Sequence, residues 1–184
     1  FAASFVIQPD KYTHPKDGVK DWSNNATVCR DWHAEQRAAG RTVITKGDVE
    51  TIKGMAKSLA KDEMVRMGLL NGLVEHSLFY KDKATGLWVK TRPDTIPTQP
   101  GKIGGHSADV SDLKTIQDVD YADCSKSLEE RGYFMQAALI RSSLKIVLDI
   151  DVATFTNVFV GKKAPFGTRP MMLDELATID HSCG

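Results

Sequence analysis

The chain has 184 residues, a formal net charge of zero, 41% hydrophobic residues and 26% charged residues. These values are ordinary for a soluble globular domain with a real core, and the neutral charge argues against a protein coated with nucleic acid while allowing a local basic groove. No apolar run is long enough to span a bilayer and no signal peptide begins the chain, so we expect no membrane association. The three cysteines form no C-x-x-C pair, which disfavours zinc and a disulfide framework and favours a reducing cytoplasm.

The hydrophobic pattern predicts an ordered series of helices and strands. The opening residues 1–7 are typical of the end of a helix or buried segment, and since the chain begins with Phe1 we expect that a preceding segment is absent. Residues 8–31 are polar and rich in turn formers, which predicts a loop. The remaining expected elements are a helix from Asp31 to Ala39, an extended piece from Thr42 to Thr45, a helix from about Asp48 to Met67, a hairpin of Val74 to Tyr80 and Leu87 to Asp94, a loop over 95–107, a strand from Ala108 to Thr115, a helix from Tyr121 or Ser127 to Leu144, and a strand from Val152 to Val160.

This order of elements predicts the fold class. Helix, hairpin, strand, helix and strand together indicate an α/β domain with a central mixed β-sheet flanked by helices. The pattern contains no repeat and no low-complexity segment. We therefore expect a single domain over residues 1–184.

Two carboxylates and a lysine stand where strands are expected to end. Asp94 closes the hairpin, and Asp112 follows eighteen residues later with Lys114 two positions beyond it. Because side chains alternate along a strand, Asp112 and Lys114 point the same way and Leu113 points into the opposite layer. Two converging carboxylates need a cation, for which Mg²⁺ is the natural choice and Mn²⁺ the alternative, and a lysine beside it can orient a water or stabilise charge on a phosphate. Asp109 is a rival ligand that faces away from Lys114.

Several motifs support a closer comparison. They are Gly86-Leu87-Trp88-Val89-Lys90-Thr91-Arg92-Pro93-Asp94, Asp112-Leu113-Lys114-Thr115, Gly132-Tyr133-Phe134-Met135-Gln136-Ala137-Ala138, the lone Glu75 and Ile7-Gln8-Pro9-Asp10. An Asp on one strand and an Asp/Glu-x-Lys on the next resemble the PD-(D/E)xK (restriction-endonuclease-like) nuclease superfamily. Within it, these stretches resemble the G-x-x-x-K-x-R-P-D, D-[LV]-K-T and Y-x-x-Q-A patterns of the RecE-type (exonuclease VIII-like) nucleases of phages and prophages, in order along nearly the whole chain.

The resemblance assigns roles to individual residues. Asp94 and Asp112 would hold the metal, with the backbone carbonyl of Leu113 as a third ligand, and Lys114 would position the attacking water or neutralise developing charge. Gln136 would hold the scissile phosphate or the nucleophile.

The resemblance leaves the roles of two further residues open. Tyr133 would lie on the same helical face as Gln136, and would act at the site or only pack there. Glu75 would orient a water at the metal, or would pair with Lys90 or Arg92 across the hairpin.

One departure from the family pattern concerns the N-terminus. The family places a His or Glu on its first helix, a turn or two before the motif that resembles Pro9-Asp10, whereas this chain has Ala3 or an absent residue there. The expected protein is therefore a single nuclease domain that lacks its N-terminal helix or segment, or an impaired copy.

The resemblance implies a Mg²⁺-dependent exodeoxyribonuclease that acts on linear double-stranded DNA ends from 5′ to 3′ and leaves 3′ overhangs for recombination. It also implies a homo-oligomeric ring around DNA and a single-strand annealing protein as partner. The alternatives are another PD-(D/E)xK enzyme, of the Cas4-like or restriction type, and a catalytically silent DNA-binding homologue. The lack of a four-cysteine set disfavours the Cas4-like type.

Overall fold

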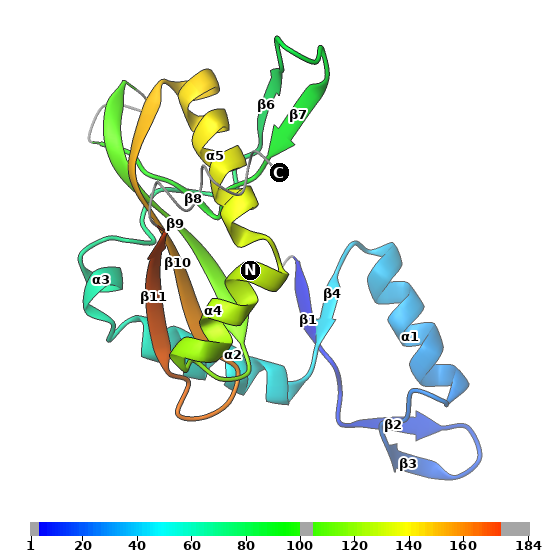
Figure 1. Ribbon diagram of the computed structural model, residues 1–184. Coiled ribbons are helices and arrows are strands. Elements are labelled where there is room, and N and C mark those ends of the chain that lie inside the picture. Colours follow the sequence, from blue (N-terminus) through cyan, green and yellow to red (C-terminus); the bar gives the residue numbers. More distant parts are fainter. Residues whose placement is uncertain (1–3, 100–104, 174–184) are drawn as a thin grey trace. The chain divides into compact units, whose positions relative to one another are not determined.

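The computed structural model describes residues 4–99 and 105–173 (Figure 1). The chain divides into two compact units, Phe1–Lys53 and Gly54–Gly184, and the boundary falls inside helix α2 (Lys46–Leu59). The single nuclease domain over residues 1–184 stays a prediction, and every described candidate site residue belongs to the second unit. Within the described ranges, no helix is both long and apolar enough to cross a membrane.

The first unit contains two small sheets and one helix. Strand β1 (Phe5–Ile7) pairs in parallel with β4 (Thr42–Ile44), and β2 (Lys11–His14) forms an antiparallel hairpin with β3 (Gly18–Asp21), ahead of helix α1 (Thr27–Ala38). The expectation of a helix end or buried segment at the start is wrong from residue 4 onward, because a partly exposed strand occupies that position. Ala3 lies outside the described residues.

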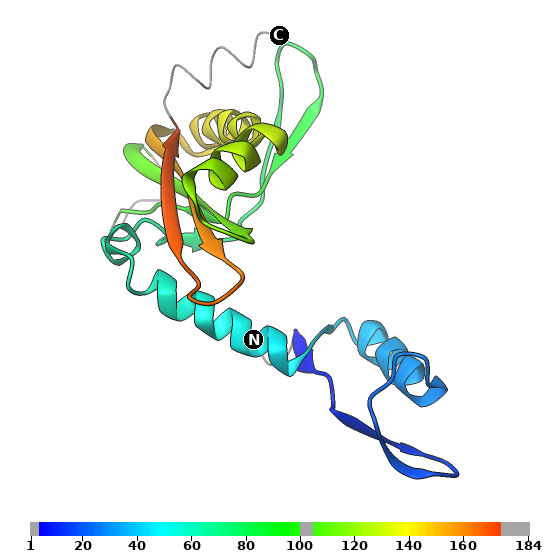
Figure 2. The ribbon, with the colours of Figure 1, turned by 60° about the horizontal axis from the view of Figure 1, so that its bottom comes forward.

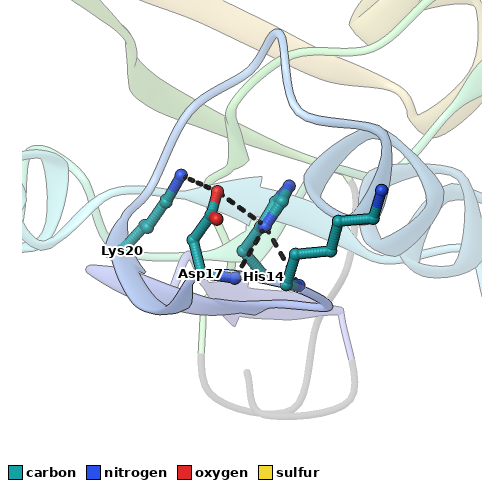
Figure 3. Close-up of polar contacts among 4 residues, drawn as sticks. His14, Asp17 and Lys20 are labelled. Atoms are coloured by element: carbon teal, nitrogen blue, oxygen red, sulfur yellow. Dashed lines mark hydrogen bonds and ion pairs between the residues drawn. The ribbon is translucent and has the colours of Figure 1, made fainter.

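The loop expected over residues 8–31 is also wrong. Polar side chains, rather than an apolar face, stabilise the β2–β3 turn, so the hydrophobic pattern gives no signal for this hairpin. The Nδ1 atom of His14 accepts hydrogen bonds from the backbone N–H groups of Lys16 and Asp17, and Lys20 donates to the Asp17 carboxylate at 2.5 Å (Figure 3). The aromatic rings of Trp22 and Trp32 also pack against each other, with centroids 5.2 Å apart.

A three-stranded mixed sheet forms the centre of the second unit. Strand β10 (Ile150–Gly161) lies between β9 (His106–Ile116), to which it is parallel, and β11 (Thr168–Leu173), to which it is antiparallel. This arrangement confirms the predicted mixed α/β class. Strand β11 was not predicted, since Pro170 and the charged Arg169 obscure its apolar pattern.

Two helices replace the single one expected between β9 and β10. They are α4 (Tyr121–Glu130) and α5 (Tyr133–Leu148), separated by Gly132 at a φ of 62°. This left-handed conformation suits glycine and ends one helix before the next begins. Helix α5 covers one face of the sheet (Figure 1), where a buried core joins it to β9 and β10. The core residues are Leu78, Ile96, Val110, Ala137, Ile140, Leu144, Ile150 and Phe155.

The other helix boundary also differs from expectation. Helix α2 ends at Leu59, and a short helix α3 (Glu63–Arg66) follows in place of a continuous helix to Met67. The Asp62 carboxylate accepts hydrogen bonds from the N–H groups of Met64 and Val65, so it starts a new helix rather than continuing the old one.

The strand expected over residues 74–80 is divided in two, and the loop expected over 95–107 is wrong at its start, where a further short strand follows the returning one. The inner pieces, β6 (Leu78–Lys81) and β7 (Trp88–Thr91), form the hairpin, and the outer pieces, β5 (Leu73–Val74) and β8 (Thr95–Ile96), form a separate antiparallel pair. Glu75 has a φ of 56°, which no regular strand allows, and it breaks the first strand. Asp94 therefore lies in a bend between β7 and β8 rather than inside a strand.

The β5–β8 pair depends on Gly72, which has a φ of 150°. A Cβ atom there would lie 2.2 Å from the backbone oxygen of Ile96. We expect Gly72→Ala to lower the free energy of unfolding by about 2–3 kcal/mol, measured by urea denaturation. The control is Gly86→Ala, where φ is also positive but the added Cβ meets no atom within 4 Å. Equal losses in the two variants would contradict this account of the close approach.

Candidate functional site

A backbone hydrogen bond brings the two predicted carboxylates to one place. The Leu113 N–H donates to Oδ2 of Asp94 at 2.6 Å. This bond attaches the bend between β7 and β8 to strand β9, one residue after Asp112. Asp94 and Asp112 thus come from different parts of the chain and act electrostatically on each other.

Asp112 is nearly inaccessible, with 1% of its surface exposed. Its Oδ2 atom pairs with the Lys114 ammonium, while Oδ1 has no hydrogen-bond donor among the described residues. Burial raises the pKa of Asp112 above its ordinary value and the nearby Asp94 raises it further, although Lys114 acts in the opposite direction. The site therefore holds a carboxylate whose negative charge is incompletely compensated.

Lys114 is held between strand and helix. Its Nζ donates to Oε1 of Gln136 at 2.8 Å and lies 4.3 Å from the ring centre of Tyr133. Both partners belong to the first turn of α5, three residues apart and hence on one face of the helix. Only 13% of the Lys114 side chain is exposed, so the ammonium has a defined position beside Asp112. As expected from strand alternation, Asp112 and Lys114 face the same way, whereas Leu113 is 37% exposed rather than packed into an opposite layer.

A cleft of about 610 Å³ opens at this point. Its lining includes Asp94, Lys114 and Tyr133, and it also includes Arg131 and Lys162. The sequence analysis missed these last two cations, because Arg131 ends α4 and Lys162 follows β10, and only the packing of helix and sheet brings them to the cleft. Both are exposed.

Glu75 forms an ion pair with Arg92 across the hairpin, while its expected role in orienting a water at the metal stays a prediction. Its Oε2 lies 2.7 Å from Nε of Arg92, and both side chains are more than half exposed. Glu75 also donates its backbone N–H to the carbonyl oxygen of Asp94 at 3.1 Å and borders the cleft. It therefore helps to fix the bend that carries Asp94.

The donor groups fit a hard divalent cation in part. Asp94 and Asp112 supply carboxylate oxygens, and the Leu113 carbonyl is expected on the same side of β9 as the N–H that binds Asp94. The buried, unpartnered Oδ1 of Asp112 is consistent with a missing positive charge. Among residues 4–99 and 105–173, no group of three His, Cys, Asp or Glu side chains could hold a metal, so other ligands would have to be waters and substrate.

Asn157 is a further buried polar group at this site that the sequence analysis missed. It is 1% exposed, and neither Oδ1 nor Nδ2 has a partner among the described residues. It lies directly across from Asp112 in the parallel β9–β10 pair. Its neighbours two positions away face α5, since Phe155 belongs to the core and Phe159 contacts Tyr133, so Asn157 faces α5 too. The available signal was one amide inside the apolar run Phe155 to Val160.

Comparisons with known proteins add one structural likeness. No protein-family model and no curated protein matches the chain. A crystal structure named "Putative exonuclease", from Eubacterium rectale, is similar with a TM-score of 0.55 and 14% sequence identity. The match covers 83% of this chain and 55% of that one, so this chain spans about half the length of the protein it matches. At this identity the likeness shows a shared fold.

The raised pKa of Asp112 gives a prediction about stability. A folded-state pKa above the unfolded value means that the folded protein binds more protons, so the free energy of unfolding falls as pH rises between the two values. Asp112→Asn removes the ionisable carboxyl group and with it this loss of stability at higher pH. The measured quantity is the melting temperature of Asp112→Asn minus that of wild type, both in EDTA. We expect this difference to be larger at pH 7 than at pH 4 by about 2 °C or more. A difference that stays constant across this range would contradict the assigned cause.

Proposed function

We propose that this chain is a divalent-metal-dependent deoxyribonuclease that digests linear double-stranded DNA from an end. One observation carries the proposal. Asp94 lines a cleft together with Lys114, and the buried Asp112 pairs with the Lys114 ammonium, which Gln136 and Tyr133 fix in place. A buried carboxylate with a raised pKa next to a cleft, as Asp112 is, is typical of functional sites.

Each residue of the site has a proposed task. Asp94, Asp112 and the Leu113 carbonyl would hold Mg²⁺, or Mn²⁺ in its place. When bound, the cation supplies charge neutralisation on the phosphate and lowers the pKa of a coordinated water. With the charge of Asp112 shared by the cation, Lys114 would be free to turn its ammonium toward the attacking water or the pentacoordinate transition state, and Gln136 would orient that ammonium.

The two cations that the sequence analysis missed fit this task. Arg131 and Lys162 line the same cleft as Lys114. No ion pair or hydrogen bond of either side chain occurs within the described part of the chain. Unpaired cations in a cleft suit the phosphates that flank the scissile bond, because such contacts position the nucleic acid backbone without reading its sequence.

The finer features of the proposal rest on the resemblance to RecE-type nucleases of the PD-(D/E)xK superfamily. They are digestion from 5′ to 3′, 3′ overhangs for recombination, a homo-oligomeric ring and a single-strand annealing partner, whereas the proposed cytoplasmic location rests on the cysteine pattern. The structural neighbour's name, "Putative exonuclease", agrees with the end-directed activity. The alternatives are a PD-(D/E)xK endonuclease and a catalytically impaired DNA-binding homologue.

Digestion of end-labelled DNA tests the proposed activity. Linear duplexes labelled at the 5′ or the 3′ end and a covalently closed circle are incubated with the protein in Mg²⁺ and in EDTA. We expect Mg²⁺-dependent loss from linear DNA alone, and a rate at least about 10³-fold lower for Asp112→Ala.

The matched control for this experiment is Asp109→Ala, which removes a carboxylate from the opposite face of the same strand and should keep most of the activity. Cleavage of the closed circle would favour the endonuclease. Intact DNA in every reaction would favour the impaired homologue.

Asn157 provides a second test, through metal affinity. We expect its amide to donate to Oδ1 of Asp112 when the metal is bound. The same two strands already contain such a pair, since Thr154 donates to its cross-strand partner Asp109 at 2.7 Å. Asn157→Val should weaken Mn²⁺ binding about tenfold by calorimetry, as is common for groups that orient a metal ligand.

Two variants serve as controls for this change. Asn157→Thr has the shape of valine but keeps a donor, and it should retain most of the affinity. Thr156→Val removes a neighbouring buried hydroxyl that also lacks a partner but faces the other side of the sheet. If Thr156→Val weakens binding as much as Asn157→Val, the effect belongs to the strand and the assigned role is wrong.

A further inference from the structure

The outer face of the β6–β7 hairpin combines aromatic rings with lysines. In this antiparallel pair, Phe79 lies opposite Lys90 and Lys81 lies opposite Trp88, so these four side chains share one face. Phe79 is 56% exposed and Trp88 is 74% exposed, and both lysines are exposed as well. The opposite face carries the buried Leu78 and Thr91 and the half-buried Tyr80 and Val89.

Large aromatic rings on the exposed face of the hairpin are the reverse of the arrangement expected if the hairpin only buried its apolar side chains. A hairpin that only packs against its domain would keep large rings inside and polar groups outside. Here Trp88 projects into solvent, and the Lys90 ammonium lies 5.5 Å from the centre of the exposed Phe79 ring. In Figures 1 and 2 the hairpin extends beyond the end of α5, so its turn lies away from the sheet.

The charge of the hairpin identifies the chemistry of its partner. Residues 78–92 hold three lysines, Lys81, Lys83 and Lys90, against one carboxylate, Asp82, while Arg92 pairs with Glu75, in a chain whose net charge is zero. Exposed rings alternating with cations match a single nucleic acid strand, whose bases stack on the rings while its phosphates meet the ammonium groups.

The hairpin is also continuous with the candidate site. Strand β7 ends at Thr91, three residues before Asp94. Asp94 lies six positions after Trp88, and an extended chain of that length spans at most about 20 Å. A strand lying on this face would therefore lead to the cleft within a few nucleotides.

We propose that the outer face of the β6–β7 hairpin, formed by Phe79, Lys81, Trp88 and Lys90, binds single-stranded DNA next to the cleft. The inference rests on the proposed nuclease function for its biological meaning, but the binding itself needs no metal and no cleavage. An exonuclease separates the strands of its substrate as it digests one of them, so a surface for single-stranded DNA beside the site would hold one of the separated strands.

The test is titration of the full chain with a short oligodeoxythymidine in EDTA, followed by tryptophan fluorescence and by anisotropy of a labelled oligonucleotide. We expect quenching in wild type that disappears in Trp88→Ala and in Trp88→Phe, because stacking on the indole causes it. The dissociation constant should rise about tenfold for Trp88→Ala and much less for Trp88→Phe, which keeps a ring for stacking. The double variant Lys81→Ser, Lys90→Ser should lower the salt dependence, the slope of log K against log salt, by about 1.4.

Matched controls change the same kinds of residue elsewhere. Tyr121→Ala removes an aromatic ring on α4 that is 67% exposed, and Lys57→Ser with Lys61→Ser removes two exposed lysines, one on α2 and one in the turn that follows it. Both controls should bind as wild type does. Equal weakening in the controls, or wild-type affinity in Trp88→Ala, would overturn the proposal.

Other outcomes separate this proposal from its rivals and from the proposed function. If Trp88→Ala leaves DNA binding unchanged but changes the oligomeric state in analytical ultracentrifugation, the face binds a second copy of the chain and the inference is overturned. Wild type that binds the oligonucleotide in EDTA but cleaves no DNA in Mg²⁺ would support this inference and count against the proposed nuclease. Wild type that cleaves DNA in Mg²⁺ but does not bind the oligonucleotide through this face would support the proposed nuclease and overturn this inference.

Discussion

The hydrogen bond from the Leu113 N–H to the Asp94 carboxylate is the interaction on which the candidate site depends. It is short, at 2.6 Å, and its acceptor is a carboxylate, which makes it stronger than a neutral hydrogen bond. Thr95, the residue after Asp94, adds a longer contact to the same strand, from its hydroxyl to the Ser111 carbonyl oxygen at 3.5 Å. The Glu75 N–H and the Glu75–Arg92 ion pair support the same bend from the hairpin side.

The buried charge and the unpartnered polar atoms of the site lower the stability of the fold, and they suit the binding of a ligand. Asp112 is buried next to another carboxylate, and its pairing with Lys114 only partly offsets these two effects. The unpartnered Oδ1 of Asp112 and the unpartnered amide of Asn157 are costs of the same kind, because buried polar atoms without partners destabilise a fold. Such features persist where function requires them, which agrees with a site that is completed by a bound cation.

The sequence predicted those parts of the structure that local patterns determine. Strand alternation was enough to place Asp112 and Lys114 on one face, and the three-residue spacing placed Tyr133 and Gln136 on one face of their helix. That this helical face meets Lys114 was expected from the family resemblance and is seen in the structure. Local patterns in the sequence did not predict contacts between residues that are far apart in the chain. The pairing of Asn157 with Asp112 depends on the β9–β10 register, which no short motif encodes.

The errors in the predicted fold have a common physical origin. The β2–β3 hairpin is stabilised by polar side chains, and β11 lies at the edge of its sheet with a proline inside it, so neither shows a clear period of two. The expected long helix and strand were interrupted by single residues with special conformations, Gly132 and Glu75 among them. Local backbone chemistry thus decided the boundaries, while the hydrophobic pattern decided the order of the central elements.

The central claim is that Asp94 and Asp112 share one divalent cation. Anomalous diffraction from crystals of the protein grown with Mn²⁺ tests it most directly. The account predicts one peak within about 2.0–2.6 Å of an oxygen of each carboxylate, on the cleft side of β9. The absence of a peak at this position, or a peak bound elsewhere at full occupancy, would contradict it.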